Sequence, residues 1–226
     1  MITRISKRRR NRQGKEVWKF VSAAVAITSI FIIYPIVYSL VLSMYRTRGL
    51  SSRFVGLGNI QRMFGDAVFL KALGNNLIYL VFQVPLMLVL GLFLAVLVNS
   101  PKLKFRTFFR LALFLPCVIS LVAYSILFKM MFQTDGLINN FLMAIYVISK
   151  PINWLNDPFW AKVTIIIALC WRWTGYNMMF FLSGLQTISG NTLEAAEIDG
   201  ANGLKKFFLV IVPQLKPIIL FTTIMS

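Results

Sequence analysis

The sequence predicts an all-helical polytopic membrane protein with four complete spans and the start of a fifth. Of its 226 residues, 58% are hydrophobic and only 14% are charged, whereas an ordinary soluble domain carries about 25% charged residues. Four apolar runs reach the roughly 20 residues that a helix needs to cross a bilayer. No run alternates apolar and polar residues as the strands of a membrane barrel do. A bundle of helices is therefore the expected fold.

The expected spans follow the apolar runs in order. They cover residues 17–44, 73–98, 108–132 and 160–185, and a fifth, incomplete span covers 217–226. The first run is longer than the core of a secretory signal, about 7–15 residues, so we expect a retained span. A shorter apolar stretch at 137–148 has about half the required length. We expect an interfacial helix there, lying along the membrane.

Positive charges predict the orientation of the chain. The formal net charge is +17, and 8 of the 24 Lys and Arg residues lie between Arg4 and Lys19, in and beside a basic tail at residues 1–16. Because cytoplasmic loops are enriched in Lys and Arg, we expect the N-terminus and the segment 191–217 on the cytoplasmic side of a bacterial inner membrane. The charge then reports orientation, and no nucleic-acid partner is expected.

Composition also argues against cofactors and catalysis in this chain. Cys117 and Cys170 lie in separate apolar runs and the sequence contains no His, so neither a zinc site nor a disulfide framework is expected. The Gly-rich loop with Lys-Ser/Thr that binds nucleotide phosphates does not occur. We therefore expect no cofactor, no metal and no catalytic residue.

The polar segment 191–213 is predicted to form two short helices. Asn191 and Glu194 have the spacing of a capping box, with Asn191 as the N-cap, and Gly200 is expected to end the first helix in a left-handed conformation. Pro213 is expected to break the chain where it re-enters the bilayer. The second helix has apolar residues at i, i+3, i+4 and i+7, namely Leu204, Phe207, Phe208 and Ile211.

The first of these helices is too short to be stable alone in water, where isolated helices under about 12–15 residues are marginal. Ala195 and Ala196 keep one side thin, and the acidic Glu194, Glu197 and Asp199 offer partners for Arg or Lys of another protein. An ordinary structured loop would carry the same caps and stripe. Spacing alone therefore leaves a docking helix and a plain loop both open.

A specific motif resembles that of a known family. The run Glu-Ala-Ala-Glu-Ile-Asp-Gly-Ala at 194–201, followed by Val-Ile-Val-Pro at 210–213, resembles the Glu-Ala-Ala signature of permease subunits in binding-protein-dependent ATP-binding-cassette importers. In that signature three residues separate Glu-Ala-Ala from Gly, and nine more precede Ile-x-Leu-Pro. The chain differs from it at Val210 and Val212.

Further motifs extend the resemblance over almost the whole chain, towards the maltose-type first permease of the carbohydrate uptake type I branch. They are Phe-Val-Gly-Leu-Gly-Asn at 54–59, Gly-Asn-Asn at 74–76, Phe-Arg-Thr-Phe-Phe-Arg at 105–110, Leu-Pro at 115–116, Gly-Leu-Ile-Asn at 136–139, Asn-Trp-Leu at 153–155 and Ser-Gly-Leu-Gln at 183–186.

The resemblance implies a type I importer fold and a permease for a sugar, an oligosaccharide or glycoside, with glycerol phosphate or another polyol as the alternative. It also implies four partners: a dimer of cytoplasmic ATP-binding subunits, a second paralogous permease, an extracytoplasmic sugar-binding protein and the lipid bilayer. Family members continue into a sixth span, so we expect a fragment or a truncated product. The residues implied to couple to the ATPase are Glu194, Ala195, Ala196, Asp199, Gly200, Ala201 and Pro213.

Within the fourth predicted span, Arg172 is a charge near the bilayer centre, where insertion costs about 2.5–3.5 kcal/mol. Trp173, Tyr176 and Asn177 follow at helical spacing. Aromatic faces and amides suit sugars, so these four residues are candidates for a substrate path. Ordinary helix packing, with Arg172 capping a carbonyl or pairing with a neighbour, is the usual explanation of an aromatic stripe at helical spacing, and both explanations stay open.

Two other function classes are less consistent with the sequence. Ion-coupled secondary carriers use carboxylates within the membrane, but all seven acidic residues here fall outside the predicted spans. A membrane glycosyltransferase would need a carboxylate pair. Asp135 and Asp157 are the only candidates for that pair, and the adjacent turn residues Gly136 and Pro158 account for them.

Overall fold

The computed structural model describes residues 18, 20–49 and 51–226, so the predicted basic tail at 1–16 lies outside the described residues. Within the described part, four stretches are long and apolar enough to cross a membrane: Phe20–Ser43, Ala67–Asn99, Leu121–Ala144 and Pro158–Thr187. The helices Gly203–Gln214 and Lys216–Met225, bent by 66°, form a candidate fifth. The prediction of a polytopic helical fold is confirmed.

The chain divides into two compact units, Met1–Leu73 and Gly74–Ser226. The first contains the helix Phe20–Ser43, which includes the π-turn η1 (Ser29–Ile33) and α2 (Tyr34–Ser43). It continues with the antiparallel strands β1 (Tyr45–Arg48) and β2 (Ser51–Phe54) and the helix α3 (Gly58–Gly65). Helix α4 (Ala67–Asn99) begins in this unit and continues in the second.

The strand pair is a difference from the all-helical prediction. Tyr45 lies opposite Phe54, and their rings meet edge to face with centroids 5.3 Å apart. Asn59 in α3 donates hydrogen bonds from Nδ2 to the carbonyls of Ser43 and Tyr45, at 2.8 and 2.9 Å. The sequence does not indicate this pairing, because the strand sequences Tyr-Arg-Thr-Arg and Ser-Ser-Arg-Phe have no clear apolar alternation.

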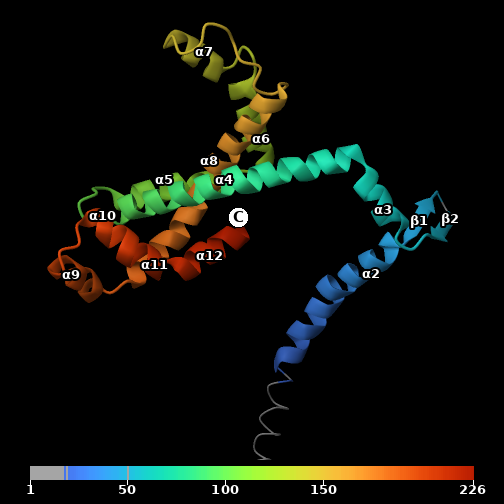
Figure 1. Ribbon diagram of the computed structural model, residues 1–226, viewed down its shortest axis with the longest axis horizontal. Helices are drawn as coiled ribbons and strands as arrows, with labels where there is room; N and C mark the ends of the chain where they lie inside the picture. The colour runs from blue at the N-terminus through green and yellow to red at the C-terminus, as the bar shows by residue number, and fades with distance from the viewer. Residues whose placement is uncertain (1–17, 19, 50) are drawn as a thin grey trace, which may run out of the picture. The chain divides into compact units, whose positions relative to one another are not determined.

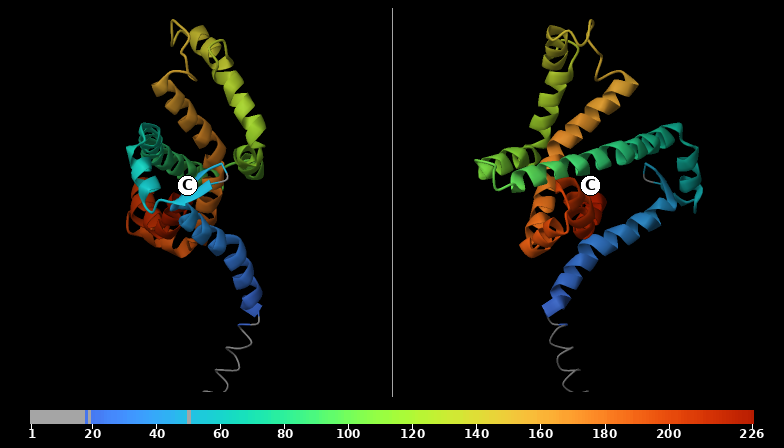
Figure 2. Two further views of the ribbon diagram at one scale, coloured as in Figure 1. Left: turned by 90° about the vertical axis from the view of Figure 1, so that its right-hand side faces the viewer. Right: turned by 60° about the vertical axis from the view of Figure 1, so that its left-hand side comes forward.

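Helix α8 (Pro158–Thr187) is the central element of the second unit. Helix α6 (Leu121–Phe132) and the N-terminal half of α8 run to the same end, where α7 (Leu137–Ala144) and its loop join them (Figures 1 and 2). The C-terminal end of α8 leads into α9 (Gly190–Ile198) and then α10 (Gly203–Lys206). The chain continues through η2 (Phe207–Ile211), α11 (Val212–Gln214) and α12 (Lys216–Met225).

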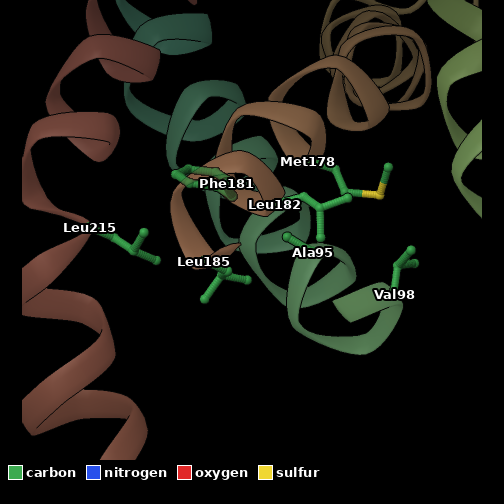
Figure 3. Close-up of a cluster of buried hydrophobic side chains, with 7 residues drawn as sticks. All are labelled: Ala95, Val98, Met178, Phe181, Leu182, Leu185 and Leu215. Carbon is green, nitrogen blue, oxygen red and sulfur yellow. The ribbon is translucent and has the colours of Figure 1, made fainter. Parts of the chain in front are cut away.

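The main hydrophobic cluster lies along the C-terminal half of α8 (Figure 3). Helix α8 contributes Met178, Phe181, Leu182 and Leu185 to it. These side chains pack with Ala95 and Val98 of α4 and with Leu215 at the junction of α11 and α12. Because lipid tails are as apolar as these side chains, close packing and dispersion hold such helices together, with little help from the hydrophobic effect.

A very close helix contact joins α8 to α5 (Arg106–Val118). A Cβ placed on Gly175 would lie 1.8 Å from the carbonyl oxygen of Leu113, so the two helices meet backbone to backbone. Two other glycines mark close contacts of α8. A Cβ on Gly91 of α4 would lie 3.3 Å from the Cβ of Asn177, and one on Gly184 would lie 2.2 Å from the side chain of Ile218. Small residues at crossings are the usual means of bringing membrane helices together.

The run predicted as one third span, 108–132, forms two helices. Helix α5 ends at Val118 and α6 begins at Leu121, with Ile119 and Ser120 extended between them. Pro116 has no N–H to donate to the preceding turn, which weakens the helix near its end. Since α5 has only 13 residues, it is too short to cross a bilayer alone.

The loop that follows α6 is tied together by Asn139, which is fully buried. Its Nδ2 donates to the carbonyls of Thr134 and Ile152 at 2.9 and 2.8 Å, while its Oδ1 accepts from the backbone N–H of Ile152 and from Nε1 of Trp154. The Trp154 ring packs edge to face on Phe132 and Trp160. The predicted interfacial segment 137–148 therefore begins with α7, which also ends the apolar stretch Leu121–Ala144, and Asn139 ties this helix to the loop that follows it.

We predict that Gly175→Ala destabilises the second unit. The new methyl group would overlap the Leu113 carbonyl, and backbone cannot yield as a flexible side chain does, so the expected cost is about 2–3 kcal/mol. Thermal unfolding of the purified protein in detergent measures the effect as a lower Tm. Gly74→Ala is the matched control, because nothing lies within 4 Å of a Cβ there; an equal Tm for the two variants would contradict the contact.

Candidate functional site

The first candidate site is the segment α9–α11 (Gly190–Gln214), which contains the residues predicted to couple to an ATPase. Helix α9 is capped by Ser189, whose hydroxyl accepts from the backbone N–H of Thr192 at 3.3 Å. The prediction that Asn191 is the N-cap is wrong, because Asn191 lies inside the helix. Both residues have side chains that suit a cap, and the extended backbone of Ser189 decides between them.

Helix α9 ends where the sequence predicts. Gly200 has a left-handed φ of +78°, which costs a glycine little. Its N–H donates to the carbonyl of Glu197 at 3.0 Å, and the N–H of Ala201 donates to the carbonyl of Ala196 at 2.9 Å. These two bonds are those of a Schellman motif, which satisfies carbonyls left free at the helix end. The left-handed terminator is confirmed.

The second helix continues through Pro213, which corrects the prediction that this proline breaks the chain. Asn202 caps α10 through a hydrogen bond from the N–H of Lys205, at 2.9 Å. The π-turn η2 widens the helix just before Pro213, and the N–H of Val212 reaches back to the carbonyl of Phe207. Pro213 has no N–H to donate, and the wider π-turn before it lets the helix pass this position. The 66° bend lies instead at Leu215.

Most of the predicted coupling residues are exposed. Glu194, Ala195, Asp199 and Gly200 are open to the surroundings, whereas Ala196 is buried. The thin side predicted for two alanines is therefore exposed only at Ala195. Glu197 forms an ion pair with Lys206, which ties α9 to α10. Large apolar side chains are also exposed on this segment: Ile198, Leu204, Phe208 and Leu209. The segment thus presents a mixed acidic and apolar surface.

The second candidate site is a cavity of about 420 Å³ between α4, α8 and the last residues of the chain, within the roughly 300–1,000 Å³ of small-molecule sites. The structure brings Trp173, Tyr176 and Asn177 together on its wall, as their helical spacing predicts. Residues that the sequence reasoning did not place there are Gln83, Met87, Leu169, Met225 and Ser226. Among the described residues that line this cavity, none carries a charge.

Aromatic rings support one wall of this cavity. The ring of Trp173 meets Tyr176 edge to face at 5.8 Å, Tyr176 meets Phe180 at 4.9 Å, and Phe180 meets Phe221 of α12 at 5.2 Å. Asn177 is almost fully buried, and its Nδ2 donates to the carbonyl of Trp173 at 3.3 Å. The aromatic side chains therefore belong both to the packing between α8 and α12 and to the cavity wall.

Arg172 lies apart from this cavity. Its guanidinium group is 5.0 Å from the ring centre of Tyr124 and 5.4 Å from that of Trp173, and Nη2 points to the carbonyl of Cys117 at 3.5 Å. That carbonyl belongs to the last turn of α5, where helical carbonyls have no partner and a positive charge is favourable. The geometry matches the alternative in which Arg172 caps a carbonyl. Its Nε and Nη1 make no hydrogen bond within the described part.

No group of three or more Cys, Asp or Glu side chains that could hold a metal ion occurs among the described residues. The acidic side chains Asp66 and Asp157 cap the helices that follow them, through hydrogen bonds from backbone N–H groups. Asp157 therefore has a structural partner, as its neighbouring Pro158 suggests from the sequence.

Comparison with known proteins identifies the family. The model of the family described as "Binding-protein-dependent transport system inner membrane component" matches residues 69–226, which include both candidate sites. This chain belongs to that family. The family resemblance predicted from the Glu-Ala-Ala motif is confirmed.

Several curated relatives of this permease family are similar over most of the chain. The lactose transport system permease protein LacF of Rhizobium radiobacter is 55% identical over 209 residues, covering 92% of this chain and 70% of the relative. The arabinooligosaccharides transport system permease protein AraP of Bacillus subtilis is 34% identical over 87% of this chain, which spans 63% of that relative. The alpha-glucoside transport system permease protein AglF of Rhizobium meliloti is 31% identical, over 88% and 59%.

Solved structures agree on the fold. A bacterial ABC transporter involved in the import of the acidic polysaccharide alginate matches with a TM-score of 0.76 and 21% identity, over 95% of this chain and 72% of the solved chain. The same kind of transporter in complex with a periplasmic protein that holds an alginate pentasaccharide matches with a TM-score of 0.73 and 20% identity, over 92% and 69%. The importer fold predicted from the sequence is therefore confirmed.

We predict that Ser189→Ala loosens α9, while Asn191→Ala does not. Losing an N-cap costs about 1 kcal/mol, which corresponds to a roughly fivefold rise in the local opening equilibrium. Hydrogen exchange of the first-turn amides of α9, measured on the purified protein, reports this change. Faster exchange in the Asn191 variant with no change in the Ser189 variant would show that the cap is misassigned.

Proposed function

We propose that this chain is a permease subunit of an ATP-driven importer for a sugar, either an oligosaccharide or a glycoside. The observation that carries the proposal is the 55% identity to the lactose permease over 92% of this chain. The arabinooligosaccharide and alpha-glucoside permeases are similar over nearly the same residues. The chain itself performs no catalysis; ATP hydrolysis resides in a separate partner.

The segment α9–α11 is the proposed docking surface for that ATPase. The ATPase contributes a groove that accepts α9 on the side of the exposed Ala195, with Arg or Lys near Glu194 and Asp199. Apolar side chains of the partner cover Ile198, Leu204 and Phe208, which are 87%, 71% and 62% exposed. Gly200 and Ala201 fix the turn between the two helices, and Pro213 lies at the far end of the second one.

Charge supports an orientation with this segment in the cytoplasm. Leu103, in the loop between α4 and α5, packs against the same cluster as Ile211, so that loop and the segment α9–α11 share one end of the second unit. The loop and the first turns of α5 carry Lys102, Lys104, Arg106 and Arg110, and the segment and its junction carry Lys205, Lys206 and Lys216. Such an excess of cations favours the cytoplasmic side, and alternating spans then place the N-terminus there too.

Two further partners belong to the proposal. An extracytoplasmic binding protein delivers the sugar, as the description of the family implies, and it approaches from the end that carries α7. A second, paralogous permease completes the path across the bilayer. The spans Phe20–Ser43 and Ala67–Asn99 leave most of their apolar side chains uncovered within the chain, and these faces are available to lipid and to that second subunit.

The cavity on α8 is the proposed wall of the sugar path. Trp173 and Tyr176 offer aromatic faces to the C–H side of a sugar ring. The buried Asn177 donates to the Trp173 carbonyl and accepts from the Ser226 hydroxyl at 3.4 Å, and its amide keeps a second N–H and a second oxygen lone pair for the hydroxyls of the sugar. Arg172 serves this wall indirectly, because its guanidinium group packs on the Trp173 ring. None of the described residues that line this cavity provides the positive charge that a glycerol phosphate permease would need, so the polyol phosphate alternative gains no support here.

We expect the assembled transporter, reconstituted in vesicles with its ATPase, its second permease and its binding protein, to import radiolabelled lactose when ATP is supplied. Uptake should stop when ATP is omitted and should continue when a protonophore collapses the ion gradients. Uptake that a protonophore abolishes and ATP depletion leaves intact would replace the proposal with an ion-coupled carrier.

We expect Glu194→Lys and Gly200→Asp to lower co-purification of the ATPase and ATP-driven uptake by at least about tenfold. The first reverses a charge at the docking surface, and the second forces a side chain into a left-handed turn. Asp135→Lys is the charge-matched control, because Asp135 is an exposed acidic residue in the loop at the α7 end. If all three variants keep the wild-type amount of bound ATPase, the docking assignment is wrong.

A further inference from the structure

Gln83 is a buried polar side chain in the middle of α4. It is 7% exposed and lies two residues before Pro85. A polar residue so placed in a membrane helix needs a partner, because an unpaired amide away from water is costly. The sequence offers a structural explanation: Pro85 frees the carbonyl four residues earlier, at Val81, and a nearby amide could satisfy it.

The structure does not support that explanation. Among the residues that the structure describes, the Gln83 side chain makes one hydrogen bond, from Nε2 to the Sδ of Met87 at 3.3 Å, and a thioether is a weak acceptor. Within the described residues, its Oε1 accepts no hydrogen bond, yet this oxygen is not among the fully enclosed polar atoms. Gln83 is also one of the residues that line the cavity, so an amide whose oxygen has no partner within the described residues borders this space.

The cavity places a second amide on a different helix. Gln83 lies on α4 and Asn177 on α8, and these helices cross where Gly91 meets the Cβ of Asn177. An amide donates and accepts, and so does a sugar hydroxyl, which makes the two groups matched partners. A charged ligand would meet no opposite charge among the described lining residues, and burying it there would be unfavourable.

We infer that Gln83 determines specificity in the sugar path: together with Asn177 it binds hydroxyl groups of an uncharged saccharide whose ring packs on Trp173 and Tyr176. This inference rests on the proposed function, and it adds a specificity-determining residue on α4 to the wall formed by α8. A site that binds a hydroxyl through a buried polar group rejects an analogue without that hydroxyl, because the group is then left unpaired.

The test uses the assembled transporter in vesicles, with lactose and a set of lactose analogues that each lack one hydroxyl. The binding protein is saturated with each sugar in turn, so that the uptake rate reports the membrane step rather than capture. Gln83→Leu removes donor and acceptor at similar size. Gln83→Asn keeps the amide but withdraws it by one methylene. Gln61→Leu, at an exposed position in α3, is the matched control.

In the wild type, one analogue should be imported about tenfold more slowly than lactose, the effect of one hydrogen bond worth about 1.4 kcal/mol. Gln83→Leu should slow lactose by about tenfold while slowing that analogue less than twofold, so the discrimination disappears. The ratio of the two uptake rates in Gln83→Asn should lie between those of the wild type and Gln83→Leu. If the leucine variant does not assemble, the asparagine variant provides the test. Gln61→Leu should retain the wild-type ratio.

A structural role alone would slow all sugars by one factor and preserve their ranking, and that result would overturn the inference. Unchanged rates in both Gln83 variants would overturn it too. A wild-type transporter that imports none of these sugars would instead remove the proposed sugar function, so the two failures are distinguishable.

Discussion

The backbone contact between Gly175 and Leu113 fixes the geometry on which the second unit depends. It holds α8 against α5 so closely that no side chain larger than hydrogen fits at this crossing. Three residues earlier on α8, Arg172 comes level with Cys117, four residues later on α5, which means that the helices run antiparallel. The open end of α5 thus receives the guanidinium group without any local motif that specifies it.

On the opposite face of α8, the contact with α5 leaves the residues that line the cavity turned towards α4. Asn177 follows Gly175 by two positions and therefore faces α4, where Gly91 leaves room for it. Trp173 and Tyr176 flank it and complete the wall, supported by Phe180 and Phe221. Helix α8 consequently serves three neighbours, with packing on one face and, on another, a mostly apolar cavity that holds two amide side chains. Larger side chains at Gly175 or Gly91 would push α8 away from α5 or α4, since membrane helices are held together by close contact.

Much of the fold follows from the sequence, because the length and apolarity of a run decide whether it can cross a bilayer. The exceptions have specific physical causes. The third run contains Pro116 and breaks after Val118. The cap of α9 is ambiguous in the sequence, since Ser189 and Asn191 are both good caps. Pro213 lies inside a helix because the π-turn before it absorbs the misfit. Each outcome depends on backbone conformation, which residue type alone does not determine.

The candidate site was also predictable only in part from the sequence. Helical spacing correctly groups Trp173, Tyr176 and Asn177, because they share one helix. It places Arg172 beside them, although the side chain turns to α5. Gln83 and Met87 could not be assigned to the cavity, since the register between α4 and α8 is a property of their packing. The available signal is a lone glutamine in an apolar span, which indicates a functional position without revealing what it faces.

The bend at Leu215 has a mechanical consequence. Leu215 is 1% exposed and belongs to the hydrophobic cluster of α4 and α8, so the corner between α11 and α12 is anchored in packed side chains. The helix before it, Gly203–Gln214, is an arm of about 18 Å at 1.5 Å per residue. A displacement of one helical turn at its free end, about 5.4 Å, corresponds to a rotation of roughly 17° at the corner. Leu215 cannot leave the hydrophobic cluster without opening a cavity there. We therefore expect a displacement at the free end of the arm to rotate α12 about Leu215 rather than to translate it.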